Sequence, residues 1–491
     1  MRLRTTLRLT AGQIADVREH LFREDHDEHA AILLVGSRVR PGRTTLLARE
    51  LHLLSDDEFP PGEHGYRQIA PQVLARLGNR AFTERLGLIS LHSHPGADRD
   101  VCLSGDDLAG HRRVFGHLLD IVGGRPVGGL ALGQRAADGE IWLKPEVISR
   151  LEKLEVVGER MESFGARPAG QLGRAGGRYD RQIQLFGTKG QRLLGGLRVA
   201  VVGLGGGGSL LVEQLAHLGV GEIIAVDFDT VAEHNLSRIV GATARDARRH
   251  TKKVQVSRRL VRRIDPSVRF TTVDGDVVDA DVAAQLTDVD WILLASDTHS
   301  SRLVVNAIAQ AYLIPTVQIG AKVDGRADGT IEQIYCAVRP VLAPEGCLYC
   351  AGVIDQQALQ RETATEEERV AQDYLGGDSG VVDPSVITLN AVGAAGAMNV
   401  LLLSAVGLGQ SGLGAHQLHT PADGAWLKLQ VERDPACLWC SAASHSRFAR
   451  GDDASLPVRR SDARRPHARP WRFRPAWGRL RRPRGGPSPA K

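Results

Sequence analysis

A buried strand that runs directly into a glycine turn is the feature that most limits the fold of this 491-residue chain. Residues 197–209 read LRVAVVGLGGGGS, and the helical stretch SLLVEQLAHLG follows at once. Glycines let the backbone approach a phosphate, and the amino end of the next helix attracts anions. Further apolar strands at 222–229, 268–275 and 290–297 alternate with helical stretches. This alternation predicts an α/β fold around a parallel sheet, with a nucleotide site at its carboxyl edge.

The default interpretation of such a turn, when Asp227 ends the next strand, is a dinucleotide-binding dehydrogenase. Polar residues at neighbouring strand ends favour a different chemistry. They are Asp229, Asn235, Arg238, Lys253, Asp297 and Arg302. A hydride site needs neither a lysine and an arginine for a triphosphate nor a further aspartate for a metal. A nucleotidyl-transfer site does, because charge builds up on the phosphates and on the departing pyrophosphate.

Together these residues resemble the ThiF/MoeB/ubiquitin-activating-enzyme superfamily over about residues 176–445. The matching motifs are Arg178-Tyr179-x-Arg181-Gln182, the glycine turn, Asp227-x-Asp229-x-Val231, Asn235-Leu236-x-Arg238, Lys253 and Asp297-x4-Arg302. The resemblance implies a Rossmann-like adenylation domain. It also implies that the C-terminal glycine carboxylate of a ubiquitin-like protein attacks the α-phosphate of ATP, which yields an acyl-adenylate and pyrophosphate.

The resemblance assigns roles to single residues as well. It implies that Asp227 holds the ribose hydroxyls of ATP and that Asp297 positions Mg²⁺. Arg181, Lys253 and Asp297 are the implied catalytic residues, and Arg181 is expected to reach into a partner subunit's site, so a homodimer is expected. The implied nucleotide-binding residues are Gly203, Gly205, Gly206, Asp227, Asp229, Asn235, Arg238, Lys253, Asp297 and Arg302. Lys252 stays an alternative to Lys253, because the stretch before it is slightly long.

Four of the six cysteines form two C-x-x-C pairs, Cys347 with Cys350 and Cys437 with Cys440. Two such pairs suit a tetrahedral structural Zn²⁺, and a thioredoxin-like redox pair is the rival interpretation. Enzymes of the ThiF/MoeB type often carry such a four-cysteine site. Residues 351–436 contain no cysteine, so we expect the chain to stop at the adenylate. The adenylate would then pass to another protein, such as a separate conjugating enzyme or a sulfur donor.

A second group of metal-binding residue types lies nearer the N-terminus. His92 and His94 are two residues apart at the end of a predicted strand, which places both imidazoles on one face, where they can share a metal. Asp106 and Asp107 open the next predicted helix, and either carboxylate can supply a third ligand. The residues alone therefore leave the third ligand open.

Two further residues fit hydrolysis at this metal. Glu28 precedes an apolar strand predicted at 30–36 and can take a proton from metal-bound water. Ser104 can donate a hydrogen bond to a developing oxyanion. The simpler interpretation of Ser104-x-x-Asp107 is a helix cap with an acid at its N3 position, which stabilises a helix without any chemistry.

In this order, Glu28, His92-x-His94 and Ser104-x-x-Asp107 resemble the JAMM (Jab/MPN) metalloprotease motif. The resemblance implies a catalytic Zn²⁺ held by His92, His94 and Asp107, with Glu28 as general base and Ser104 assisting at the oxyanion. It also implies cleavage of peptide or isopeptide bonds that follow the C-terminal glycine of ubiquitin-like proteins. The stretch between His94 and Asp107 is slightly long for the family, so Asp106 remains an alternative.

The motifs divide the chain into two catalytic domains with connecting and terminal segments. We predict an MPN-type, JAMM-like zinc (iso)peptidase domain at 1–145 and a helical and Gly-rich linker at 146–177. A ThiF/MoeB-like adenylyltransferase domain follows at 178–445, and a disordered Arg/Pro-rich tail at 446–491.

Charge and hydropathy narrow the partners. The net charge is +5, but residues 441–491 carry 14 Lys and Arg against 3 Asp and Glu, which leaves −6 for the rest and argues against nucleic acid as a partner. Residues 384–415 are uncharged and long enough to span a bilayer, yet their Gly, Asn and Ser favour a buried or dimer-interface helix rather than a membrane segment. The N-terminus shows no export signal, so a cytoplasmic enzyme is expected.

The function that fits best is adenylation of the C-terminal glycine of a ubiquitin-like protein, combined with zinc-dependent cleavage of ubiquitin-like precursors or conjugates. Such a pair suits a bacterial ubiquitin-like conjugation system. The alternative is activation of a sulfur-carrier protein, by adenylation and then thiocarboxylate formation, for cofactor or amino-acid biosynthesis. A more remote alternative is a non-catalytic scaffold that binds a nucleotide.

Overall fold

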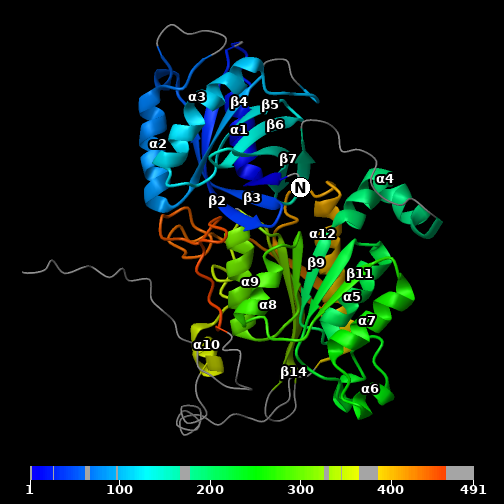
Figure 1. Ribbon diagram of the computed structural model, residues 1–491. Coiled ribbons are helices and arrows are strands. Elements are labelled where there is room, and N and C mark those ends of the chain that lie inside the picture. The colour runs from blue at the N-terminus through cyan, green and yellow to red at the C-terminus, as the bar shows by residue number, and fades with distance from the viewer. Residues whose placement is uncertain are drawn as a thin grey trace, which may run out of the picture.

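The computed structural model describes residues 3–25, 27–60, 67–94, 98–165, 177–325, 331–343, 345–363 and 385–460. These residues form two eight-stranded sheets that follow one another along the chain. The first sheet lies in the blue and cyan part of the chain and the second in the green to orange part (Figure 1).

The first sheet closes on itself, because β1 pairs with both β3 and β7. Its strands are β1 (Arg4–Thr10), β2 (Ala30–Arg40), β3 (Arg43–Leu53), β4 (Gly87–Ser93), β5 (Val127–Leu132), β6 (Ala137–Lys144), β7 (Val147–Val157) and β8 (Glu162–Phe164). Its helices are α1 (Ala11–Leu21), α2 (Pro71–Glu84) and α3 (Gly105–Ile121). Apolar side chains of the strands fill two clusters, one packed with α1 and the other with α2 and α3.

The helical linker predicted at 146–177 is wrong, because β7 and β8 occupy its first part. Residues 147–157 read VISRLEKLEVV, in which charged and apolar residues alternate closely enough to fit either a helix or a strand. Pairing with β1 and β6 decides for a strand, since Leu151, Leu154 and Val156 then enter the core. The predicted Gly-rich stretch falls largely on residues 166–176, which lie outside the described residues.

The second sheet confirms the predicted α/β architecture. Its order is β11-β10-β9-β12-β13-β14-β15-β16, with parallel pairing from β11 to β13 and antiparallel pairing beyond. The strands are β9 (Arg198–Val202), β10 (Glu222–Val226), β11 (Arg269–Val273), β12 (Trp291–Leu294), β13 (Thr316–Gly325), β14 (Ile331–Val341), β15 (His416–Thr420) and β16 (Ala425–Leu429).

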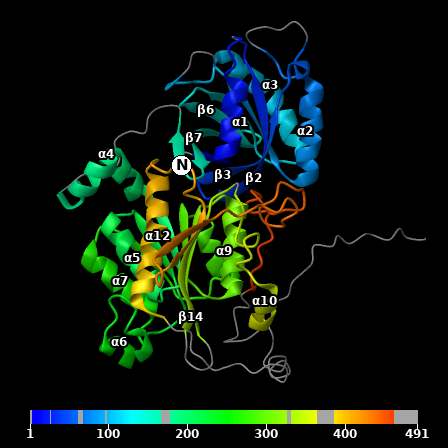
Figure 2. The same ribbon diagram turned by 180° about the vertical axis from the view of Figure 1, so that it is seen from behind.

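Helices cover both faces of this sheet, as a doubly wound fold requires. The helices are α4 (Asp180–Gly196), α5 (Gly206–Leu218), α6 (Ala244–Arg248), α7 (Lys253–Ile264), α8 (Ala280–Leu286), α9 (His299–Tyr312), α10 (Gln356–Thr363) and α12 (Ile387–Ala405). Helices α8 and α9 pack in one core, and α5, α7 and α12 in the other. Figure 2 shows α9 and α5 on opposite sides of the strands.

Helix α12 carries the uncharged stretch noted in the sequence. It is the one helix among the described residues that is long and apolar enough to cross a membrane, a test that core helices also pass. Its buried side chains, including Ala397, Met398 and Leu401, pack into the core beside α5 and β14. This packing agrees with the expected buried helix, and 44% of the tested window is buried.

The predicted disordered tail begins too early. Residues 441–459, here called the strap, run between the two halves of the molecule as the orange-red segment of Figure 1. Phe448 and Ala449 are buried in the core beside α9, and the Ala449 amide donates to the carbonyl of Gln310 at 2.9 Å. The strap shows no helical or strand periodicity, so its sequence pattern gave no sign of this packing. Residues 461–491 lie outside the described residues.

The strap also contacts the first sheet. Gly451 forms an isolated parallel bridge with Ser37, and the Asp452 amide donates to the Ser37 carbonyl at 2.9 Å. At its far end, Arg459 pairs with Asp276 at 2.8 Å and with Asp279 at 3.0 Å in the second half. The strap therefore joins the two halves.

Candidate functional site

A cavity of about 1020 Å³ opens at the carboxyl ends of β9, β10 and β12. All of the predicted nucleotide-binding residues line it: Gly203, Gly205, Gly206, Asp227, Asp229, Asn235, Arg238, Lys253, Asp297 and Arg302. These positions come from five separate segments, and the parallel strands bring them to one edge of the sheet.

The glycine turn is shaped by close backbone contacts. Gly203 has φ +85°, a conformation that favours glycine, and a Cβ there would lie 2.8 Å from the Ser296 amide nitrogen. A Cβ on Gly208 would lie only 1.8 Å from the Gly203 carbonyl oxygen. The turn therefore brings the amino end of α5 against the cavity, where its free amides favour an anion.

Asp227 is anchored for binding at the end of β10. Its carboxylate accepts hydrogen bonds from the amides of Leu204 at 2.6 Å and Asp229 at 2.8 Å. Burial raises the pKa of this carboxyl, while Lys253 and the two amides oppose that shift.

Of the two candidate lysines, Lys253 lines the cavity. Its Nζ lies 2.6 Å from the Asp229 carboxylate and 3.9 Å from that of Asp227. Lys252 instead pairs with Asp274 at 3.0 Å and donates to the Phe228 carbonyl. The structure thus favours Lys253 as the lysine of the site.

Asp297 and Arg302 come from the end of β12 and the first turn of α9. No described side chain forms a hydrogen bond or an ion pair with the Asp297 carboxylate, so its oxygens are available to a cation such as Mg²⁺. Burial lowers the pKa of Arg302, whose Nη1 donates to the Val353 carbonyl at 3.3 Å. Arg181 does not line the cavity of its own chain; it is exposed on α4.

Part of the cavity wall was not predicted. Lys322, Tyr335, Arg339, Ser385 and Asn390 also line it. They come from the antiparallel strands β13 and β14 and from α12 and the residues before it. No local motif marks these residues, because their place depends on how β14 pairs with β13.

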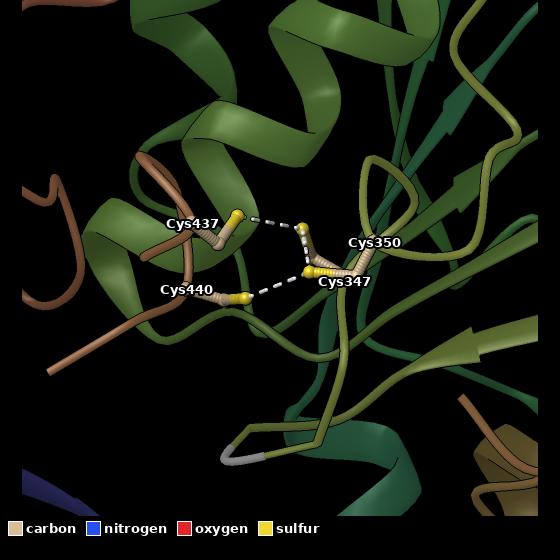
Figure 3. A group of neighbouring side chains, drawn as sticks. All are labelled: Cys347, Cys350, Cys437 and Cys440. Atoms are coloured by element: carbon tan, nitrogen blue, oxygen red, sulfur yellow. Dashed lines mark hydrogen bonds between the residues drawn. The ribbon is translucent and has the colours of Figure 1, made fainter. Parts of the chain in front are cut away.

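The four cysteines of the two C-x-x-C pairs form one cluster (Figure 3). Sγ–Sγ distances are 3.8 Å for Cys347–Cys350, 3.8 Å for Cys347–Cys437 and 3.5 Å for Cys350–Cys440. A tetrahedron of sulfurs around zinc, with Zn–S near 2.3 Å, has edges of about 3.8 Å. Hydrogen bonds from Cys347 lower the pKa of Cys350 and of Cys437, which favours the thiolates that a metal needs. The cluster could therefore hold Zn²⁺.

A second metal-binding group combines His92, His94 and Asp107, whose ligand atoms all lie within 4.8 Å of one another. The Nε2 atoms of the two histidines are 3.1 Å apart, and they lie 3.2 Å and 3.5 Å from the Asp107 carboxylate. Asp106 is exposed and is not part of the group. Three ligands that leave a position open are the arrangement of catalytic rather than structural zinc.

Ser104 caps α3 and supports this group at the same time. Its amide and hydroxyl both donate to the Asp107 carboxylate at 2.7 Å, while the Asp107 amide donates back to Ser104 Oγ at 3.1 Å. The predicted helix cap is therefore present, and the same hydrogen bonds hold the Asp107 carboxylate in place. Glu28 is half-buried, its burial raises its pKa, and the charges that act on it are those of His92, His94 and Asp107.

Comparisons with known proteins address the second half of the chain. The ThiF family matches residues 179–431. Molybdopterin-synthase adenylyltransferase of Escherichia coli K12 is 30% identical over 266 residues, which cover 54% of this chain and 95% of that protein. Sulfur carrier protein ThiS adenylyltransferase of the same strain is 27% identical over 269 residues, which cover 54% of this chain and 96% of that protein.

Two further comparisons cover smaller or less similar parts of known proteins. The SAMP-activating enzyme E1 of Haloferax volcanii is 35% identical over 163 residues, covering 32% of this chain and 59% of that protein. A crystal structure of E. coli MccB with ATP aligns over 54% of this chain and 75% of that one, with 19% identity and a TM-score of 0.43, which is too low to add weight. The family match spans more than half of the chain and contains the whole glycine turn. The chain therefore belongs to the ThiF family, as an adenylyltransferase of that family.

Proposed function

We propose that this protein adenylates the C-terminal glycine of a small sulfur-carrier or ubiquitin-like protein. The observation that carries the proposal is that the whole predicted set of nucleotide-binding residues lines one cavity in a chain of the ThiF family. Two E. coli relatives match this chain over 95% and 96% of their own length, and they are named as a molybdopterin-synthase adenylyltransferase and a sulfur carrier protein ThiS adenylyltransferase. These names favour a sulfur-carrier substrate over a ubiquitin-like conjugation substrate.

The residues of the cavity suit this reaction. Asp227, held by two amides, accepts hydroxyl donors of a ribose, while Arg238 and Lys253 supply positive charge for phosphates. Mg²⁺ would be held by Asp297 and would neutralise charge on the phosphates and on the departing pyrophosphate. We further propose a homodimer in which Arg181, exposed on α4, serves the cavity of the partner subunit.

ATP–pyrophosphate exchange tests this proposal. The purified protein is mixed in turn with the small proteins of the same genome that end in Gly-Gly. Exchange is expected with at least one of them, and Asp297→Asn should lower its rate by about 100-fold or more. Asp274→Asn is the matched control, because this exposed carboxylate pairs with Lys252 outside the cavity. Exchange that survives Asp297→Asn, or that occurs with no substrate protein, contradicts the proposal.

A second function is favoured by the His92–His94–Asp107 group. We propose that it holds a catalytic zinc and that the N-terminal half cleaves a bond after the C-terminal glycine of the same small protein. When bound, the metal would polarise a carbonyl and lower the pKa of a water. Glu28, half-buried beside the group, would take the proton of that water, and Ser104 would keep Asp107 oriented.

This second proposal has its own assay. The small protein is supplied with a peptide extension after its terminal glycine, and release of the extension is followed in the presence of Zn²⁺. Glu28→Gln should abolish cleavage while zinc binding is retained, whereas the control Glu24→Gln, an exposed acid on the same segment, should cleave normally. Equal cleavage by Glu28→Gln would remove Glu28 as the base.

A further inference from the structure

Two arginines, Arg302 and Arg339, line the cavity without a carboxylate in ion-pair contact. Arg339 on β14 donates from Nη1 to the Oε1 of Gln318 at 2.7 Å, and Gln318 is fully buried and neutral. Burial lowers the pKa of Arg339, and the charge of Arg302 lowers it further. Within the described part of the chain, no carboxylate lies in ion-pair distance of either guanidinium.

Arg302 adds a second open position. Its Nε is buried with no hydrogen-bond partner among the described residues, although Nη1 reaches the carbonyl of Val353. A buried donor without a partner is costly. Asp297 and Glu362, the carboxylates whose charges act on Arg302, form no ion pair with its guanidinium. Two such arginines that face one cavity indicate that an anion binds between them.

The order of the strands places this anion beyond the nucleotide. Asp227 follows β10 and Asp297 follows β12, two strands further along the sheet, so a nucleotide whose ribose binds Asp227 has its phosphates near β9 and β12. Arg339 lies on β14, which is two strands beyond β12 and therefore about 10 Å from it across the sheet. Its guanidinium points toward the neighbouring strand β13, where it donates to Gln318. Arg238 and Lys253 line the same cavity and can supply positive charge for the phosphates.

We propose that Arg339 binds the C-terminal carboxylate of the substrate protein, with Arg302 beside it, and presents it to the α-phosphate. The proposal rests on the adenylation function proposed above. Gln318 occupies one Nη of Arg339, and the remaining donors can form paired hydrogen bonds with a carboxylate, the geometry that guanidinium favours.

In the reaction, one carboxylate oxygen forms a bond to the α-phosphorus. The bond from that phosphorus to the oxygen that bridges to the β-phosphate breaks, and pyrophosphate leaves with the electron pair. Arg339 stays protonated throughout, because no proton is transferred. Its hydrogen bonds persist on the other carboxylate oxygen, which becomes the acyl carbonyl of the adenylate.

The test compares two ligands on the full-length protein loaded with the ATP analogue AMPCPP, which cannot release pyrophosphate. One ligand is a short synthetic peptide that ends in Gly-Gly with a free carboxylate, and the other is the same peptide with a terminal amide. The wild type should bind the carboxylate about tenfold or more tightly than the amide. Arg339→Gln should lose this preference, and Arg339→Lys should restore part of it.

Arg269→Gln is the matched control, since Arg269 is exposed on β11 at the opposite edge of the same sheet. It should keep the preference, and all variants should bind AMPCPP like the wild type. Arg339→Gln that keeps the preference, or that weakens AMPCPP binding tenfold, overturns the role of Arg339 while adenylation itself stands. A wild type that binds AMPCPP but shows neither a preference nor any ATP–pyrophosphate exchange overturns the adenylation proposal as well.

Discussion

Replacement of Arg49 by methionine should release the strap from the first sheet. Arg49 lies on β3 with its side chain only 3% exposed, and its guanidinium donates to the carbonyls of Ala443 at 2.8 Å, of Ser444 at 3.3 Å and of Phe448. A weaker contact reaches Ser446 Oγ at 3.4 Å. Methionine keeps the apolar stem but has no donor, so the strap would lose these bonds together.

Two opposing terms set the size of this effect. Three hydrogen bonds from a charged donor contribute about 1.5–3 kcal/mol each, or roughly 5–9 kcal/mol together. Burial and the nearby charge of Arg450 lower the pKa of Arg49 to about 10, so keeping it charged in the fold costs about 3 kcal/mol, which methionine recovers. The free energy that holds this part of the strap on the first sheet should therefore fall by about 2–6 kcal/mol. The effect should stay local, because Asp452 and Arg459 still hold the strap at other points.

Limited proteolysis measures this local opening. Trypsin can cut after Arg447 and Arg450 only when the strap detaches, so a loss of 2 kcal/mol should raise the cleavage rate by about 30-fold. Arg4→Met is the control, because Arg4 is exposed on β1 and its guanidinium pairs with Glu152 at 3.1 Å rather than with the strap. A rise of less than threefold in Arg49→Met would refute the idea that this buried arginine holds the strap.

Three further predictions concern the second half of the chain. Burial, with help from the charge of Arg339, lowers the pKa of His416 to about 4. Because a histidine in the unfolded chain has a pKa near 6.5 and takes up a proton first, acidification from pH 6.5 to 4 should lower the free energy of unfolding by up to about 3 kcal/mol. His416→Leu should therefore flatten the pH dependence of the urea midpoint. Gly208→Ala places a Cβ 1.8 Å from a backbone oxygen and should weaken AMPCPP binding at least tenfold in calorimetry, whereas Gly196→Ala, with nothing within 4 Å, should not. Cys437→Ser should remove about one equivalent of zinc by elemental analysis, and an unchanged zinc content would mean that the cluster holds none.

The parts of this fold that were predictable depend on short-range patterns. The strand, turn and helix at 197–219 are adjacent in sequence, and the glycines report a steric need that the structure shows at Gly203 and Gly208. Each C-x-x-C pair places two candidate ligands on one loop, so the sequence left open only whether the two pairs come together in the fold. The capping pattern of Ser104 and Asp107 was likewise local, and it is present as expected.

The parts that were missed depend on pairing between distant residues. Strand β7 became a strand because β1, more than a hundred residues earlier, pairs with it. Arg339 reaches the cavity because it stands opposite Gln318 across the antiparallel pair of β13 and β14. The burial of Phe448 requires the surface of α9 to be in place first. None of these contacts leaves a periodic or motif signal in the segment itself.

The cysteine cluster has a consequence for how the second half folds. Cys347 and Cys437 are 90 residues apart, and the segment between them includes α10, α12, β15 and β16. A metal held by all four cysteines would bind the folded chain and not the unfolded one, so its binding free energy would add to the free energy of folding. Starvation for that metal would then deprive the cell of folded enzyme even though the cluster lies outside the nucleotide cavity.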